Sequence, residues 1–171
     1  MTVSSPQNAG RGRHLRQVQV LARRLIVALL ALCPVTMARA DTGLGGLDLS
    51  AYRGKVVYLD FWASWCAPCK ASFPYMEGLQ IDHGKQGLVV IAVNLDHDRA
   101  KADAFLAAED ARHIQVMYDS KGQIAKSFKV KAMPTSLLIG RDGTVRFVHS
   151  GFREGETGLY DAHLQELLHE K

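Results

Sequence analysis

The chain has 171 residues, of which 47% are hydrophobic and 22% charged, a composition typical of a soluble globular protein rather than a disordered or membrane-embedded one. This length allows one domain of roughly 100–150 residues and a short extension. The net charge of +4 comes from residues 1–40, which carry six arginines and no acidic residue. The remaining 15 Lys and Arg are outnumbered by 17 Asp and Glu, so we expect no binding to nucleic acid.

Residues 1–40 have the order of a secretory signal peptide. Arginines precede an unbroken apolar run over residues 25–32, and the small residues Ala38 and Ala40 follow. The run is too short for the roughly twenty residues that span a bilayer. We therefore predict export to the periplasm, cleavage after Ala40 and a single domain over residues 41–171. The alternative is an uncleaved segment that anchors the chain to a membrane.

The segments that follow alternate between strand and helix patterns. Strands are predicted at residues 56–62, 88–95, 114–118, 136–139 and 144–149, and helices at residues 67–80, 98–109, 121–128 and 157–169. The continuous apolar run over 88–95 is typical of a strand buried on both faces of a sheet, and Asp142-Gly143 indicates a hairpin. This order predicts the α/β class, with a mixed central β-sheet flanked by helices on both faces.

Two helices carry more detailed expectations. Pro74 lies inside the first helix and is expected to kink it. The last helix is expected to bury Leu159, Leu164, Leu167 and Leu168 on its inner side.

The segment Trp65-Cys66-Ala67-Pro68-Cys69-Lys70 lies where a predicted strand ends and a predicted helix begins. Two cysteines three positions apart on the first turn of a helix can form a disulfide with little backbone movement. The unpaired N–H groups and the positive end of the helix dipole stabilise a thiolate there. The spacing therefore predicts an exposed nucleophile at Cys66 and a more buried resolving thiol at Cys69.

Other uses of this cysteine pair are less well supported. A structural disulfide would close too short a loop to add much stability, and no second Cys pair or His cluster completes a zinc site. Copper binding by the two thiolates stays open. The histidines that follow the predicted signal are scattered and are expected on the surface or in loops: His83, His97, His113, His149, His163 and His169.

Residues 60–70, with Pro74 five positions after Cys69, resemble the active-site segment of the thioredoxin superfamily. Met133-Pro134-Thr135, directly before a predicted strand, resembles the cis-proline loop of that superfamily. The signal sequence and the runs 72–74 and 92–96 make the chain more similar to exported TlpA-type disulfide reductases than to cytosolic thioredoxin. The similarity covers residues 48–169 and implies a thioredoxin-like fold.

The resemblance also implies roles for individual residues. Cys66 matches the attacking cysteine and Cys69 the resolving one. Pro134 matches the proline whose preceding bond is cis, which would set the Met133 main chain beside Cys66 to pair with an extended substrate. Trp65 is expected at the rim of the site.

Asp60 lies six residues before Cys66 in an otherwise apolar strand. It matches the buried acid of thioredoxin, which implies a raised pKa and a role in accepting the proton of Cys69. A solvent-exposed Asp at the end of the strand is the alternative. Two positions depart from the pattern of many TlpA-type reductases, which have Asn where Asp60 stands and Glu where Ser72 stands.

The expected activity is reduction of protein disulfides by dithiol exchange, and cytochrome c or metalloprotein assembly is the candidate setting. The Cys66–Cys69 pair would need no cofactor and no metal, and the resemblance implies a membrane-bound electron donor that reduces it again. We expect a monomer. A disulfide-forming oxidase and a copper-binding metallochaperone or assembly module are the alternatives.

Overall fold

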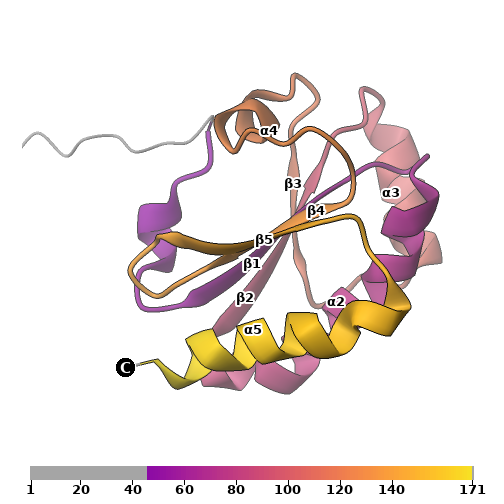
Figure 1. Cartoon of the computed structure of the whole chain (residues 1–171). Helices are drawn as coiled ribbons and strands as arrows, with labels where there is room; N and C mark the ends of the chain where they lie inside the picture. The colour runs from indigo at the N-terminus through magenta and orange to yellow at the C-terminus, as the bar shows by residue number, and fades with distance from the viewer. Residues whose placement is uncertain (1–45, 171) are drawn as a thin grey trace, which may run out of the picture. The chain divides into compact units, whose positions relative to one another are not determined.

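A computed structural model of the protein describes residues 46–170. Its centre is a five-stranded sheet with the strand order β3-β2-β1-β4-β5 (Figure 1). The strands are β1 (Val56–Trp62), β2 (Leu88–Asn94), β3 (Gln115–Tyr118), β4 (Thr135–Ile139) and β5 (Val145–Ser150). β1, β2 and β3 run parallel, whereas β4 is antiparallel to both β1 and β5. The predicted mixed sheet is confirmed.

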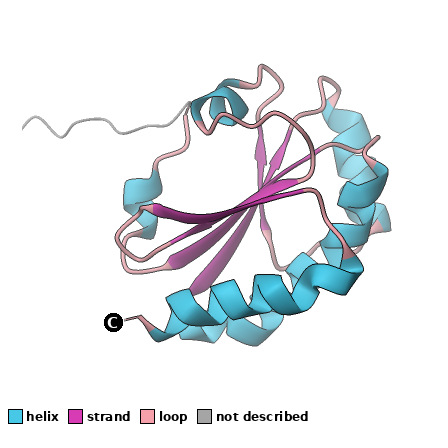
Figure 2. Ribbon diagram, in the orientation of Figure 1, coloured by secondary structure: helices cyan, strands magenta, loops and turns pink. Residues whose placement is uncertain are grey.

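Helices cover both faces of this sheet (Figure 2). The α-helices are α2 (Ala67–His83), α3 (Arg99–Ala108), α4 (Gln123–Ser127) and α5 (Thr157–His169), and short 3-10 helices are η1 (Leu49–Tyr52), η2 (Gly84–Gln86) and η3 (Glu154–Glu156). Each predicted helix and strand is present. β1 and α5 have the predicted bounds, and the other elements differ at their ends by one to three residues. The largest difference is in α2, which continues past Pro74 to His83.

Two hydrophobic layers form because successive residues of a strand point to opposite faces of the sheet. All seven residues of β1 are buried. Val56, Tyr58 and Trp62 pack against α2, α3 and α5. Val57, Leu59 and Phe61 pack in the layer that contains η1 and α4. Asp60 has the same parity as Tyr58 and Trp62, so its side chain lies in the layer of α2.

One expectation about α5 is wrong. Leu159 is 52% exposed, and the neighbouring Tyr160 is buried in its place. Tyr160, Leu164, Leu167 and Leu168 follow the spacing of one helical face, whereas Leu159 lies about 100° away from Tyr160 around the helix axis.

The expectation that the histidines lie on the surface or in loops is wrong for His149. It lies in β5 and is 9% exposed. Its Nε2 atom is 3.0 Å from Nδ1 of His163 in α5. Packing of α5 on β5 thus brings together two residues that are distant in the sequence.

The predicted signal peptide at residues 1–40 lies outside the described residues. Within residues 46–170, no helix combines the length and apolar character needed to cross a membrane.

Candidate active site

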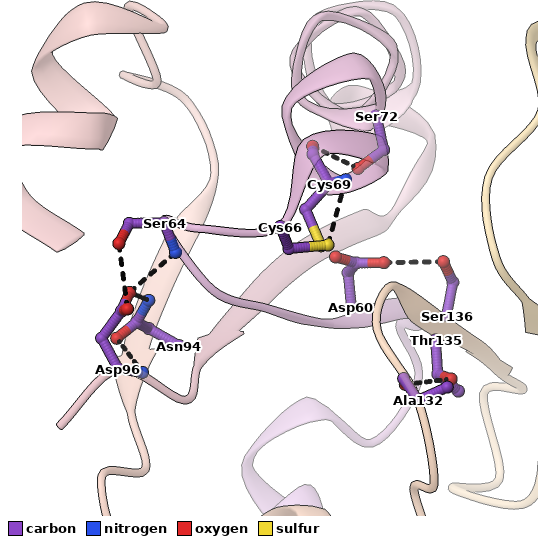
Figure 3. Close-up of a disulfide and its surroundings, with 10 residues drawn as sticks. All are labelled: Asp60, Ser64, Cys66, Cys69, Ser72, Asn94, Asp96, Ala132, Thr135 and Ser136. Atoms are coloured by element: carbon purple, nitrogen blue, oxygen red, sulfur yellow. Dashed lines mark hydrogen bonds between the residues drawn. A yellow bond between two sulfur atoms is a disulfide. The ribbon is translucent and has the colours of Figure 1, made fainter. Parts of the chain in front are cut away.

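Cys66 and Cys69 form a disulfide at the start of α2, with Cα atoms 5.2 Å apart (Figure 3). Cys66 is the N-cap of the helix, and its Sγ accepts a hydrogen bond from the Cys69 N–H at 3.3 Å. Pro68 lies in the first turn, where a missing N–H costs no helical hydrogen bond. Cys66 is 6% exposed and Cys69 is fully buried. Cys69 is therefore the more buried of the two, as predicted, but the expectation of an exposed Cys66 is wrong for this disulfide form, because the residue packs into the layer covered by α2.

Cys66 is the expected nucleophile, and its position at the start of α2 bears on this prediction. The first-turn N–H groups of a helix have no partner within the helix, and the helix dipole is positive there. The Cys69 N–H already points at Cys66 Sγ, so it can stabilise negative charge on that sulfur.

The loop before Cys66 is fastened to the end of β2. The Asp96 carboxylate accepts hydrogen bonds from the Ser64 N–H at 2.8 Å, the Ser64 hydroxyl at 2.9 Å and the Asn94 amide at 2.7 Å (Figure 3). Asp96 is 6% exposed. Sequence reasoning assigned no role to this residue, although an acidic side chain directly after a buried apolar strand is a usable signal.

Asp60 is fully buried beneath the disulfide, so the alternative of a solvent-exposed residue is excluded. Its Oδ1 atom accepts a hydrogen bond from the Ser136 hydroxyl at 2.7 Å. Its Oδ2 atom has no hydrogen-bond partner within the described part of the chain. Burial raises the pKa of Asp60 from 3.8 to about 7, although the hydrogen bond from Ser136 acts in the opposite direction.

Two residues beside Asp60 were missed by sequence reasoning. Ser136 faces Asp60 across the β1–β4 pair, and Tyr58 Oη donates to Ser136 Oγ at 3.0 Å. A hydroxyl in the apolar run of β4, and a tyrosine two residues before the buried acid on the same strand face, are the signals that could have pointed to them.

The peptide bond between Met133 and Pro134 is cis. The Thr135 hydroxyl donates to the Ala132 carbonyl at 2.8 Å, and the Pro134 carbonyl accepts from the Gly151 N–H at 2.8 Å. Met133 is half-buried and packs against the hydrophobic layer that contains both cysteines. The placement of the Met133 main chain beside Cys66 and its contact with substrate stay predictions.

The two tryptophans of the segment have different surroundings. Trp62 is fully buried against Phe73 and Phe105, with ring centroids 4.8 Å away in each case. Trp65, directly before Cys66, is 71% exposed. Its position fits the expected rim of the site, and its role in binding substrate stays a prediction.

Among residues 46–170, no group of three or more His, Cys, Asp or Glu side chains is placed to hold a metal ion. A Cu(I) ion held by two thiolates needs only a pair of ligands, so this finding leaves the copper-binding alternative open.

The Redoxin family model matches residues 31–164. The chain is 33% identical over 111 residues to the thiol-disulfide oxidoreductase ResA of Bacillus subtilis, a match that covers 65% of this chain and 62% of ResA. It is 35% identical over 105 residues to ResA of Oceanobacillus iheyensis, covering 61% of this chain and 54% of that protein. The chain thus spans less than two thirds of the length of these relatives.

Solved structures of thiol-disulfide exchange proteins are also similar to this chain. A crystal structure of a putative thiol:disulfide interchange protein DsbE from Chlorobium tepidum has 44% sequence identity and a TM-score of 0.69, and the match covers 71% of this chain and 86% of that one. The exposed lipoprotein thioredoxin Etrx1 of Streptococcus pneumoniae has 33% identity and a TM-score of 0.59, covering 70% and 87%. The resemblance to the thioredoxin superfamily is confirmed, and this chain belongs to the Redoxin family.

Proposed function

We propose that the protein is an exported enzyme that reduces protein disulfides by dithiol exchange through Cys66 and Cys69. The observation that carries this proposal is the arrangement at the start of α2. The Cys66 sulfur caps the helix, the fully buried Cys69 lies one turn later, and a buried carboxyl group lies on the side of the sulfur atoms. The names of the ResA relatives support the same class of reaction.

In the first step the Cys66 thiolate attacks a substrate disulfide and forms a mixed disulfide. The displaced substrate sulfur leaves as a thiolate and takes a proton from solvent. In the second step Cys69 gives its proton to Asp60 Oδ2 and its thiolate attacks Cys66 Sγ. The Cys66–Cys69 disulfide forms, the second substrate sulfur leaves and is protonated, and two electrons have passed from the protein to the substrate.

The direction of exchange depends on the reduction potential of the Cys66–Cys69 pair relative to that of its partners. Known dithiol proteins of this kind range from about −270 to −120 mV. We propose the reducing direction on the basis of the resemblance to TlpA-type reductases. A membrane-bound electron donor would then return the pair to the dithiol form in the periplasm.

The test uses the full chain with Cys33 replaced by Ala, so that any adduct reports on the site alone. The chain should accelerate the reduction of insulin disulfides by dithiothreitol. Cys66→Ser should abolish this acceleration, whereas Cys69→Ser should accumulate a mixed disulfide on Cys66 that mass spectrometry can detect. Equal activity of the Cys66→Ser chain would contradict the proposal.

A Cu(I) titration of the reduced chain tests the metallochaperone alternative. Stoichiometric Cu(I) binding by a chain that catalyses no disulfide exchange would replace the proposed function. Exchange activity with no stoichiometric Cu(I) binding is the expected result.

A further inference from the structure

Two hydrogen bonds join three buried polar side chains into a line that ends at Asp60. Tyr58 and Asp60 lie on β1, and Ser136 lies opposite Asp60 on the antiparallel strand β4. All three are in the layer covered by α2 and α5, and their exposed fractions are 1%, 0% and 4%. Buried polar groups of this kind are costly unless their hydrogen bonds are made.

The hydrogen bonds in this line have one direction. An ionised carboxylate only accepts, so the Ser136 hydroxyl donates to Asp60 Oδ1 at 2.7 Å. A serine hydroxyl has one hydrogen, and Ser136 Oγ can therefore only accept from Tyr58 Oη, at 3.0 Å. Burial keeps the pKa of Tyr58 above its ordinary range, so Tyr58 stays a donor at neutral pH.

This arrangement makes the two oxygens of Asp60 unequal. Oδ1 is occupied by Ser136, whereas Oδ2 has no partner within residues 46–170. In Figure 3 the carboxyl group lies between Ser136 and the disulfide, with its unbonded oxygen on the side of the sulfur atoms. A proton taken up by this carboxylate would therefore reside on the oxygen that faces the disulfide.

We propose that Ser136 is a positioning residue that aims Asp60 Oδ2 at Cys69, and that Tyr58 fixes the direction of the Ser136 hydroxyl. The inference rests on the proposed function, because it concerns the acceptor of the Cys69 proton. Ser136 holds the carboxyl group against rotation and stabilises its ionised, proton-accepting form. Removal of the hydroxyl should therefore affect both the proton affinity of Asp60 and the second step of exchange.

The other titratable groups around this line can be separated from Asp60. Tyr58 lies on the same strand, and His149 lies opposite Ser136 on β5. Cys66, Cys69 and Tyr75 lie on α2, and Tyr160 and Asp161 on α5 act on Tyr58. Burial raises the pKa of Tyr75 and Tyr160 above the ordinary value of a tyrosine. In the disulfide form the two cysteines do not titrate. Burial and the neighbouring His163 lower the pKa of His149 below 6.5, so Asp60 is the group in this set expected to titrate near pH 7.

The first measurement is the carboxyl ¹³C chemical shift of Asp60 against pH in the oxidised full chain. Ser136→Ala should raise its pKa by about one pH unit, because a hydrogen bond that stabilises the carboxylate is lost. Ser136→Thr, which keeps a hydroxyl, should restore a value near that of the original chain. Tyr58→Phe should raise the pKa by a smaller amount, since Ser136 still donates but is no longer polarised by a donor.

Ile139→Val serves as the matched control, because Ile139 lies on the same strand but faces the opposite layer. It should leave the pKa of Asp60 unchanged. An unchanged or lowered pKa in Ser136→Ala, or an equal rise in Ile139→Val, would overturn the proposal.

The second measurement is the rate at which Cys69 resolves a mixed disulfide placed on Cys66. Ser136→Ala should slow this step about tenfold near pH 7 while Ser136→Thr restores it. A raised pKa with an unchanged rate would mean that Ser136 does not aim Asp60. Failure of the original chain to resolve any mixed disulfide would instead contradict the proposed function, while the pKa measurement would still report on Ser136.

Discussion

Asp96 accepts two hydrogen bonds from Ser64, one from its main-chain N–H at 2.8 Å and one from its hydroxyl at 2.9 Å. Ser64 stands two residues before Cys66, and the Cys66 N–H donates to the Ala63 carbonyl at 3.1 Å. The end of β2 therefore fixes the loop from which the reactive sulfur projects. Asp96 also accepts a hydrogen bond from Asn94, the last residue of β2. It therefore joins the carboxyl end of β2 to the loop that follows β1, beside the disulfide.

Replacement of Asp96 by Ala should destabilise the oxidised chain by about 2–4 kcal/mol, because three buried or partly buried donors lose a charged acceptor. Urea unfolding at pH 7 measures this change. The matched control is Asp98→Ala, which removes the exposed N-cap of α3 and should cost about 1 kcal/mol. Equal losses for the two variants would show that Asp96 is no special anchor.

Asp60 should make the stability of the protein fall as pH rises. Burial raises its pKa from 3.8 to about 7, so between these values the folded state binds more protons than the unfolded state, and the free energy of unfolding decreases. Asp60→Asn removes this dependence. Its stability relative to the original chain should therefore increase from pH 4 to pH 7, by up to about 4 kcal/mol, and then level off.

Urea unfolding of both oxidised chains at several pH values measures that difference, in which the contributions of all other groups cancel. A difference that does not change with pH would show that Asp60 has an ordinary pKa in the folded state.

Asp60→Asn should also slow disulfide exchange at the second step. Asn cannot accept the Cys69 proton, and loss of a general base typically costs a factor of about 10² or more. Stopped-flow measurement of the resolution of a mixed disulfide on Cys66 isolates this step. The inflection near pH 7 in its rate profile should disappear, and unchanged kinetics would remove Asp60 from the mechanism.

The His149–His163 pair should make the protein sensitive to acid. Burial and the neighbouring His163 lower the pKa of His149, so the unfolded state binds more protons and stability is lost as pH falls below about 6.5. His149→Gln should reduce the loss of thermal stability between pH 7 and pH 5. His169→Gln, at the exposed end of α5, should retain the full loss, and identical profiles for both variants would be the contrary result.

The strands and helices were predictable because their signals are local. The β-branched and aromatic run of β1 was expected at the bounds it has, 56–62, since such residues favour a buried strand regardless of what covers them. The start of α2 was equally clear, because Cys66, Ala67 and Pro68 form a helix N-terminus by themselves. The roles expected of Cys66 and Cys69 follow from this one segment.

Residues that meet through tertiary contacts were not predictable in the same way. Ser136 reaches Asp60 only because β4 pairs with β1 in one register, and a shift by one residue would turn the hydroxyl to the opposite face. His149 meets His163 only because α5 packs on β5. The expected burial of Leu159 was wrong for a related reason. Several leucines of α5 could form its buried face, and the position of the sheet determines which of them do.

The reduction potential of the Cys66–Cys69 pair decides whether this pair exchanges disulfides or is a structural crosslink. The full chain with Cys33 replaced by Ala is equilibrated with glutathione buffers, and the fractions of disulfide and dithiol are measured by mass spectrometry. We expect one two-electron transition between about −270 and −120 mV, the range of proteins that exchange disulfides. A pair that stays oxidised in every glutathione buffer, with a potential below about −300 mV, would be a structural disulfide and would contradict the account.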